Sequence, residues 1–316
     1  MTKPNPLIAL FEGARRAQSN TALYDHYDNV RVVIPGKPVV RSIIDLNGDL
    51  LPRIEAENGM HLKRPPVGRP AVEVTTIGAG IIKQSLVAQA GAEVIIYADP
   101  TKAVSVGELG DVVLERRPAY FETYEAAPFS LVADGQQVTV TPLPIKRAAI
   151  HVDADGGPQT NTASYGLRFE FSRPTMKNYP NFEDAIMHVM TQGLARTTDT
   201  VLLGQIVAAA PAPFSLSAAA ASAVRFRELR ALVGTNATGA AVGQDGELRA
   251  AGIAAELTPD MAATLVGSFA RAAIMIRSDV EVIAERVNID GSVAFTAWAA
   301  LQPLLPDTSR FWTVEA

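Results

Sequence analysis

Apolar side chains recur at three- and four-residue steps between Asn181 and Ala210, which places them along one face of a helix. Asn181 is a suitable N-cap, and Glu183 and Asp184 follow in the first turn, where carboxylates favour the positive end of the helix dipole. Pro211 ends the pattern. We therefore predict a helix over residues 182–210, roughly 40 Å long at about 1.5 Å per residue. Its apolar stripe comprises Phe182, Ile186, Val189, Met190, Gly193, Thr197, Val201, Leu202 and Ile206.

The chain before this helix is mainly strand-like. Apolar runs cover residues 30–46 and 50–57, and Asn47-Gly48 between them is a strong hairpin signal. A short helix is expected within residues 5–23 and an extended linker at 61–70. Residues 165–174 alternate between apolar and polar, which predicts a half-buried strand.

The chain after the helix is rich in alanine and mixes both kinds of element. Residues 215–234 predict a helix, with Ser217 as its cap and Gly234 at its end. Residues 261–287 predict a turn, a buried strand and an alternating strand, and the aromatic C-terminal segment SRFWTVEA predicts a short strand. The fold class expected from this order is α+β.

Composition narrows the class of protein. Of 316 residues, 48% are apolar and 19% are charged, which is typical of a globular chain. No apolar run approaches the ~18 residues of a membrane-spanning helix, and no membrane contact is expected. The absence of cysteine excludes disulfides, thiolate metal sites and a cysteine nucleophile. The net charge of −5 comes from residues 181–316, and no basic patch of the kind that drives nucleic-acid affinity stands out.

One stretch offers enzyme-like chemistry. Thr76-Ile77-Gly78-Ala79-Gly80 lies between a predicted strand and a predicted helix, and a second strand ends at Asp99. In a dinucleotide-binding unit of this order, glycines let backbone amides approach a pyrophosphate. Lys83 occupies the third glycine position, however, and no alternating strand–helix series follows. A structural turn is favoured, and an oxidoreductase using Gly78 and Gly80 stays as an alternative.

The remaining candidates for chemistry are weaker. His26, His61, His151 and His188 are scattered without ligand spacing, and residues 25–28 and 151–157 are interpreted as turns. The sequence therefore predicts no catalytic, cofactor-binding or metal-binding residue. Residues 116–129 mix both charge signs with four aromatic side chains, which suits either a protein–protein contact or an ordinary hairpin packed on its own domain.

Several segments of residues 142–316 occur in a characteristic order. FEFSRP precedes the long helix, GLARTTDTVLLGQI lies within it, and Gly267-Ser268-Phe269 precedes a buried strand at 273–276. Arg277-Ser278-Asp279-Val280 and the terminal RFWTVEA follow. With these segments in this order, the chain resembles the major capsid (coat) proteins of tailed bacteriophages, whose fold is shared with encapsulin shells.

The resemblance implies an α+β phage major-capsid-type fold with an N-terminal arm, an extended β-hairpin loop, a peripheral domain with a long spine helix, and an axial α/β domain. The implied boundaries are 1–30 for the arm, 31–145 for a β-rich region with the extended loop, 146–212 for the peripheral domain with spine helix 182–210, and 213–316 for the axial domain with segments returning to the peripheral domain. Residues 30–75 and 108–142 are both candidates for the extended loop.

The resemblance also implies a function. Such a chain self-assembles as pentamers and hexamers into an icosahedral shell around double-stranded DNA, without sequence-specific contact to that DNA. It is not an enzyme and needs no cofactor, and it resides in the virion after assembly in the host cytoplasm. Scaffolding, portal or decoration proteins are further possible partners, and an encapsulin-like protein compartment is an alternative kind of shell.

Overall fold

The computed structural model describes residues 5–16, 21–24, 30–34, 39–51, 55–57, 61–63, 75–98, 101–106, 111–116, 119–150, 163–179, 181–287 and 291–315. The helices are α1 (Pro6–Arg16), α2 (Ile77–Gln84), α3 (Leu86–Gln89), α4 (Arg173–Asn178), α5 (Phe182–Ala208) and α6 (Leu216–Ala221). The strands are β1 (Thr21–Tyr24), β2 (Val30–Ile34), β3 (Val39–Asp45), β4 (Glu55–Glu57), β5 (His61–Lys63), β6 (Glu93–Tyr97), β7 (Thr101–Val106), β8 (Asp111–Arg116), β9 (Ala119–Tyr124), β10 (Ile145–Ile150), β11 (Ala163–Phe171), β12 (Arg230–Val233), β13 (Ala240–Val242), β14 (Leu248–Ala250), β15 (Ile253–Leu257), β16 (Thr264–Gly267), β17 (Ala273–Arg277), β18 (Asp279–Arg286), β19 (Val293–Leu304) and β20 (Phe311–Thr313). This confirms the α+β class.

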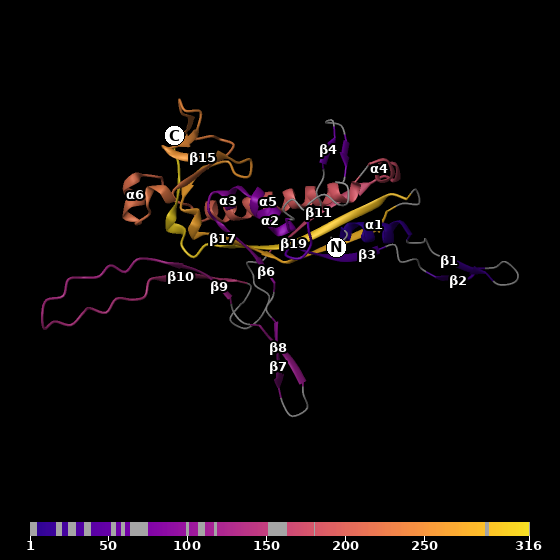
Figure 1. The fold of residues 1–316 in the computed structure, drawn as a ribbon, viewed down its shortest axis with the longest axis horizontal. Coiled ribbons are helices and arrows are strands. Elements are labelled where there is room, and N and C mark those ends of the chain that lie inside the picture. The colour runs from indigo at the N-terminus through magenta and orange to yellow at the C-terminus, as the bar shows by residue number, and fades with distance from the viewer. Residues whose placement is uncertain are drawn as a thin grey trace.

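The long helix predicted from the sequence is α5, which crosses the middle of the molecule (Figure 1). Asn181 occupies the N-cap position, as predicted, but its backbone is left-handed at φ 56° and its side chain makes no capping hydrogen bond. The buried surface is also wider than the predicted stripe. It includes Thr191 and Thr198, whose hydroxyls donate to carbonyl oxygens one turn back and are thereby satisfied inside the core.

The main sheet has the order β3-β18-β19-β17-β6. Strand β11 lies off this path and pairs with the edge of β19 opposite to β17 and β18. The central strand β19 is twelve residues long and pairs antiparallel with β11, β17 and β18. Helices α1 and α5 pack against this sheet, and α2 and α3 pack on α5. The large apolar core therefore lies between the sheet and a layer of helices.

Helix α1 belongs to this core, although it lies within the span expected as an N-terminal arm. Leu7, Leu10, Phe11 and Ala14 are buried. The Phe11 ring lies 5.7 Å from the Phe295 ring of β19 in a stacked arrangement. This end of the chain is therefore fastened to the body at residues 6–16.

A second sheet, of order β13-β14-β15-β12-β16-β20, is built from the later part of the chain. The helix predicted over 215–234 was wrong here. Helix α6 ends at Ala221, and its cap is Ser215 rather than Ser217. Residues 230–233 form the buried strand β12, which pairs with both β15 and β16. Alanine and leucine accept either conformation, and tertiary pairing decides between them.

The hairpin predicted at Asn47-Gly48 was also wrong. A turn does form, in which the Asp49 backbone N–H donates to the Asp45 carbonyl oxygen at 2.8 Å. Strand β3, however, pairs with β18 rather than with the residues that follow the turn. The predicted linker at 61–70 begins with β5, and residues 64–70 lie outside the described residues.

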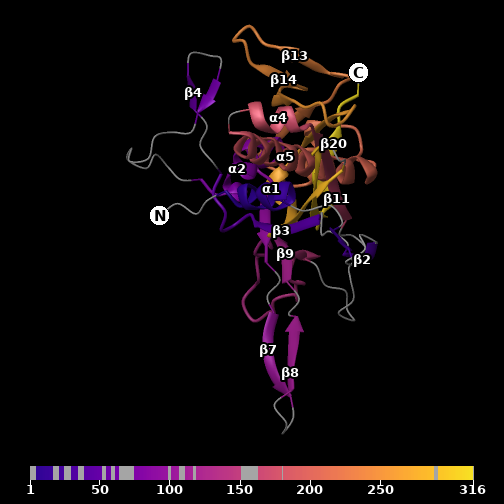
Figure 2. The same ribbon diagram turned by 90° about the vertical axis from the view of Figure 1, so that its right-hand side faces the viewer.

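Four two-stranded units, β1–β2, β4–β5, β7–β8 and β9–β10, project from the body in different directions (Figures 1 and 2). All four are antiparallel. The base of β9–β10 packs on the sheet, where Phe121 and Ile150 form a small cluster with Ala273, Met275 and Leu304. The molecule is thus a layered body with outstretched hairpins.

Candidate interaction surfaces

The glycine turn expected at residues 76–80 is not formed. Helix α2 begins at Ile77, so that Gly78 and Gly80 lie inside the helix and are buried. A β-carbon on Gly78 would collide with the Ile96 side chain and approach the Leu46 carbonyl oxygen to 2.9 Å. Both glycines therefore serve close packing of α2, whereas a pyrophosphate cradle needs them in the loop ahead of the helix.

A buried carboxylate holds the neighbouring helix α3 in place. The Ser85 hydroxyl donates to the Asp199 carboxylate at 2.6 Å, and the backbone N–H groups of Leu86 and Val87 donate to it at 3.0 Å each. Burial raises the pKa of Asp199, while these three hydrogen bonds favour its ionised form. All three donors belong to the start of α3, so the carboxylate of Asp199 positions that helix.

The described part of the chain contains no candidate metal site and no candidate membrane-spanning helix. Among those residues, no three His, Asp or Glu side chains are grouped so that they could hold a metal ion. None of the described helices is long and apolar enough to span a membrane. His188 is half-buried on α5, His61 lies in β5, and His26, His151 and residues 153–157 lie outside the described residues.

The most unusual surface is the distal part of hairpin β9–β10. The paired strands end at Tyr124 and Ile145, and residues 126–143 continue outward as two arms joined by a turn at Asp134-Gly135. We call residues 126–143 the extension. Pro128 and Pro142 lack the N–H groups that a ladder between the arms would need. Each arm of about eight residues reaches ~26 Å.

The extension is apolar and uncovered. Phe129 and Leu131 on one arm are 105% and 102% exposed, and Val140 on the other arm is 92% exposed. Val138 and Leu143 are also exposed. Large apolar side chains standing this free of their own chain are typical of a surface that another molecule covers. Of the two interpretations of residues 116–129, packing on its own domain holds for Phe121. Contact with another protein stays a prediction, for which Phe129 is exposed.

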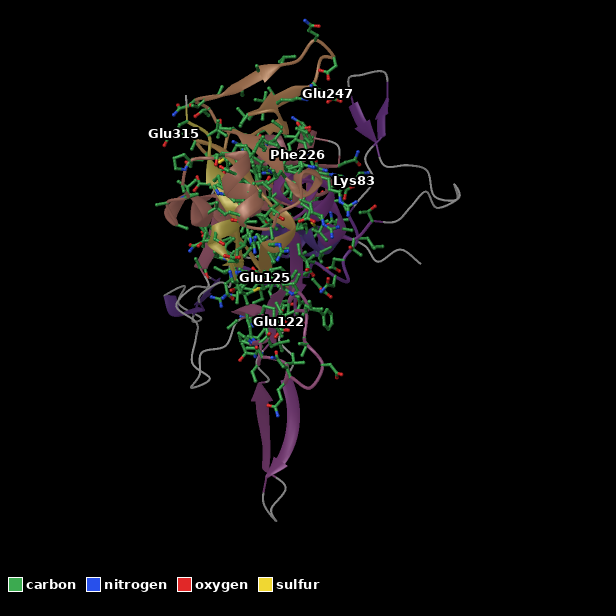
Figure 3. All side chains as sticks on the ribbon, turned by 90° about the vertical axis from the view of Figure 1, so that its left-hand side faces the viewer. Lys83, Glu122, Glu125, Phe226, Glu247 and Glu315 are labelled. Carbon is green, nitrogen blue, oxygen red and sulfur yellow. The ribbon has the colours of Figure 1, made fainter. Side chains whose placement is uncertain are left out.

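A cluster of four charged side chains fixes the base of this hairpin to the end of the chain. Arg310 donates to the Glu125 carboxylate at 2.6 Å and to the Asp307 carboxylate at 3.1 Å. The Lys146 ammonium lies 2.7 Å from Asp307 and 3.5 Å from Glu125. We call Glu125, Lys146, Asp307 and Arg310 the anchor. Figure 3 shows Glu125 and Glu122 in the region where the hairpin leaves the body.

The anchor holds both acids in their ionised form. Burial alone would raise the pKa of Asp307, but hydrogen bonds from Lys146 and from the hydroxyl and backbone of Ser309 outweigh it and hold that pKa well below its ordinary value. The hydrogen bond from Arg310 likewise lowers the pKa of Glu125. Since the anchor binds both hairpin strands to residues 307–310, it sets the direction in which the extension points.

Acid is expected to weaken the anchor. Because the folded-state pKa of Asp307 lies below the unfolded value, its contribution to stability is fully present above about pH 4 and is lost as the pH falls toward the folded pKa. The free energy of unfolding should therefore fall more steeply below pH 4 in the parent chain than in Asp307→Asn. Urea titrations of both chains at pH 7, 4 and 3 measure this difference. Parallel pH profiles would show that Asp307 contributes nothing.

The sequence did not reveal the anchor, because its members are far apart. Arg310 and Glu125 are separated by 185 positions, and nothing local marks them as partners. The extension was predicted in part, since most of it lies within residues 108–142, one of the two candidates for the extended loop, and Phe129 ends the aromatic segment that the sequence singled out. The exposure of its second arm was not predicted, because Val138-Thr139-Val140 alternates as an ordinary half-buried strand does.

Comparison with known proteins gives matches of structure only. No family model matches the sequence, and no curated protein matches it. Solved structures that align with the chain include the satellite phage P4 procapsid with its size determination (Sid) protein, at TM-score 0.45 and 12% identity, covering 74% of this chain and 96% of that chain. The capsid of an empty GTA particle aligns at TM-score 0.44 and 11% identity over 80% and 95% of the two chains. Gordonia phage Cozz aligns at TM-score 0.44 and 12% identity over 79% and 98%.

The chain resembles phage capsid structures. Identities near 12% and TM-scores below 0.5 transfer no residue roles. The function is therefore inferred from the surfaces of this chain.

Proposed function

We propose that this chain is a major capsid protein that self-assembles into pentamers and hexamers of an icosahedral shell enclosing double-stranded DNA. The observation that carries the proposal is the uncovered apolar extension, fixed by the anchor to a layered body. A contact between an arm on one copy and a different surface on the next copy is heterologous, and such contacts close into rings when the rotation permits. Shell subunits need this geometry and need no reactive group in a cleft.

The domain plan follows from the same proposal. We assign residues 146–212 to a peripheral domain built around α5 and residues 213–316 to an axial domain whose own sheet contains β12–β16 and β20. Strands β17, β18 and β19 return from that part of the chain to the main sheet, which supports the expected interleaving. We assign the extended loop to residues 119–150, which overlap the candidate 108–142, rather than to 30–75.

The proposed contact with DNA is not sequence-specific. The acidic excess of residues 181–316 would keep a packaged duplex from binding tightly to the wall, since tight binding comes from many contacts between basic side chains and phosphates. The proposed location is the virion, after assembly in the host cytoplasm. Scaffolding, portal and decoration proteins are proposed as further partners.

Sedimentation velocity and negative-stain microscopy of the purified full chain test the proposal. We expect capsomers or closed shells whose abundance rises with protein concentration. A monomer at every concentration and ionic strength tried would refute it. Nuclease-protected double-stranded DNA inside particles from the native source is the expected content, and protein cargo in its place would identify an encapsulin-like compartment instead.

A further inference from the structure

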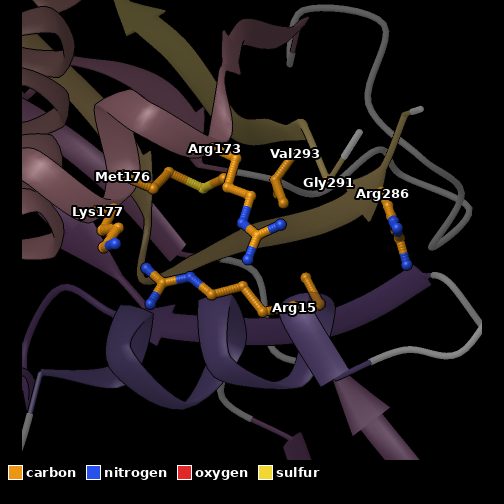
Figure 4. Close-up of a pocket in the computed structure, with 8 residues that line it drawn as sticks. Arg15, Arg173, Met176, Lys177, Arg286, Gly291 and Val293 are labelled. Atoms are coloured by element: carbon orange, nitrogen blue, oxygen red, sulfur yellow. The ribbon is translucent and has the colours of Figure 1, made fainter. Parts of the chain in front are cut away.

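A basic pocket lies on one side of the short helix α4. Four of the residues that line it are basic: Arg15 from α1, Arg173 and Lys177 from α4, and Arg286 from β18. The pocket has a volume of about 510 Å³, and none of its lining residues is acidic. Figure 4 shows the Arg15 and Arg173 side chains extending into the same space. Of the nearby acids, Glu183 pairs with Arg15 at 2.9 Å, and Arg173 and Lys177 add further positive charge to the site.

An apolar groove lies on the other side of the same helix. Its volume is about 240 Å³, and its lining includes Phe171 of β11, Tyr179 after α4, and Phe182 and Val189 of α5. Tyr179 and Val189 are about half exposed, at 48% and 50%. Helix α4 therefore separates a positively charged pocket from an apolar groove. Its six residues make it about 9 Å long.

The extension has the complementary chemistry. Asp134, in the turn at its end, is the single charged residue between Glu125 and Lys146. Leu131 precedes Asp134 by three residues and Val138 follows it by four, which places exposed apolar groups about 10–13 Å behind the carboxylate. That separation is close to the diameter of a helix with its side chains, about 10–12 Å, and so to the spacing of surfaces on opposite sides of α4. An acidic turn with apolar arms thus fits a basic pocket beside an apolar groove.

The two surfaces belong to different copies of the chain. The extension projects from one end of the body, whereas α4 lies toward the opposite end (Figure 1). We propose that α4 receives the extension of a neighbouring copy, with Asp134 in the basic pocket and the apolar arms on the groove. This inference rests on the proposed self-assembly and adds to it the surface and residues that receive the hairpin.

Engineered cysteines test the contact directly, because the chain has no cysteine of its own. Leu131→Cys, at a position that the proposal places on the groove, is put on one batch of full chain and Thr175→Cys, which lines the groove, on another. Both changes leave Asp134 and the four basic residues intact. After mixing, assembly and mild oxidation, we expect a disulfide between the two kinds of chain, since it forms only where the β-carbons approach within about 4.5 Å.

The matched control is Ser217→Cys, on α6, mixed with Leu131→Cys. Equal crosslinking of residues 175 and 217, or shells that assemble without any 131–175 disulfide, would overturn the acceptor site while leaving the proposed function intact. A parent chain that never assembles would instead refute the proposed function. The two failures are therefore distinguishable.

Charge reversal tests the proposed pairing of Asp134 with the basic pocket. Asp134→Arg and Arg173→Glu should each lower the assembly constant about tenfold, and the double variant should recover most of that loss because the pair is restored with opposite polarity. Glu256→Arg, which reverses an exposed acid on β15, is the control and should have little effect. A double variant that assembles no better than the weaker single variant contradicts the pairing of Asp134 with this pocket. If inorganic phosphate competes with assembly only in chains that retain Arg173, the pocket's preference for anions is supported as well.

Discussion

A chain in which residues 127–142 are replaced by a two-residue Asn-Gly turn is expected to fold normally and to form no shells. The removed residues carry Phe129, Leu131 and Val140, which are almost fully exposed and add nothing to the core. Within the extension the backbone makes one turn hydrogen bond, from the Gln136 N–H to the Ala133 carbonyl oxygen at 3.0 Å. The remaining strands keep their register, in which Tyr124 lies opposite Ile145.

Loss of assembly should be nearly complete, because the apolar surface that one copy offers to the next is gone. Thermal unfolding followed by circular dichroism checks the fold, and sedimentation velocity checks assembly. Gln136→Ser combined with Gln137→Ser is the matched control, since it changes the same turn without removing apolar surface. Shells of normal yield from the shortened chain would contradict the role of the extension. Phe129→Ser with Val140→Ser is a milder variant that decides the matter if the shortened chain misfolds.

The anchor explains why the position of the extension depends on distant residues. An arm works as an assembly element only if every copy presents it in one direction, and Arg310 and Asp307 bind its base from outside the hairpin. Opposite charges that hydrogen-bond at low exposure hold geometry better than exposed pairs do. Under the proposed assembly, residues 307–310 would fix the direction in which the extension points.

The local sequence was sufficient to predict secondary structure wherever one hydrophobic pattern dominates. Helix α5 was predictable because its apolar spacing persists over 27 residues and proline follows it. Strands β17 and β18 were predictable because a buried run and an alternating run lie side by side in the sequence, which leaves little choice of conformation. Even there, the cap at Asn181 and the width of the buried face depended on neighbours that the helix sequence does not contain.

The elements that the local sequence did not predict depend on contacts between residues that lie far apart in the chain. Residues 230–233 look helical in isolation, and they form a strand because β15 and β16 lie on either side of them. Gly78 suggests a loop in isolation, but it lies in α2, where its missing β-carbon leaves room for Leu46 and Ile96 to pack closely. The same limit applies to the candidate surfaces: the pocket beside α4 brings together Arg15, Arg173 and Arg286 from three distant segments.

Truncation of one core aromatic is expected to have the largest effect on stability. Phe11 is fully buried, and its ring lies 5.2 Å from that of Phe182 and 5.7 Å from that of Phe295. Phe11→Ala should lower the free energy of unfolding by about 3–5 kcal/mol, because it removes buried apolar area and leaves a cavity between α1, α5 and β19. That is a large part of the ~5–15 kcal/mol that usually stabilises a domain.

Phe226→Ala is the matched control, because Phe226 is 62% exposed and the same truncation there should change stability by less than about 1 kcal/mol. Urea titration of both variants measures the difference, and equal effects would show that α1 is not part of the core. The variant also links stability to assembly, since α1 carries Arg15 into the wall of the basic pocket. If α1 detaches when Phe11 is lost, the acceptor loses one of its basic side chains, and Phe11→Ala should assemble less well even under conditions in which the rest of the chain stays folded.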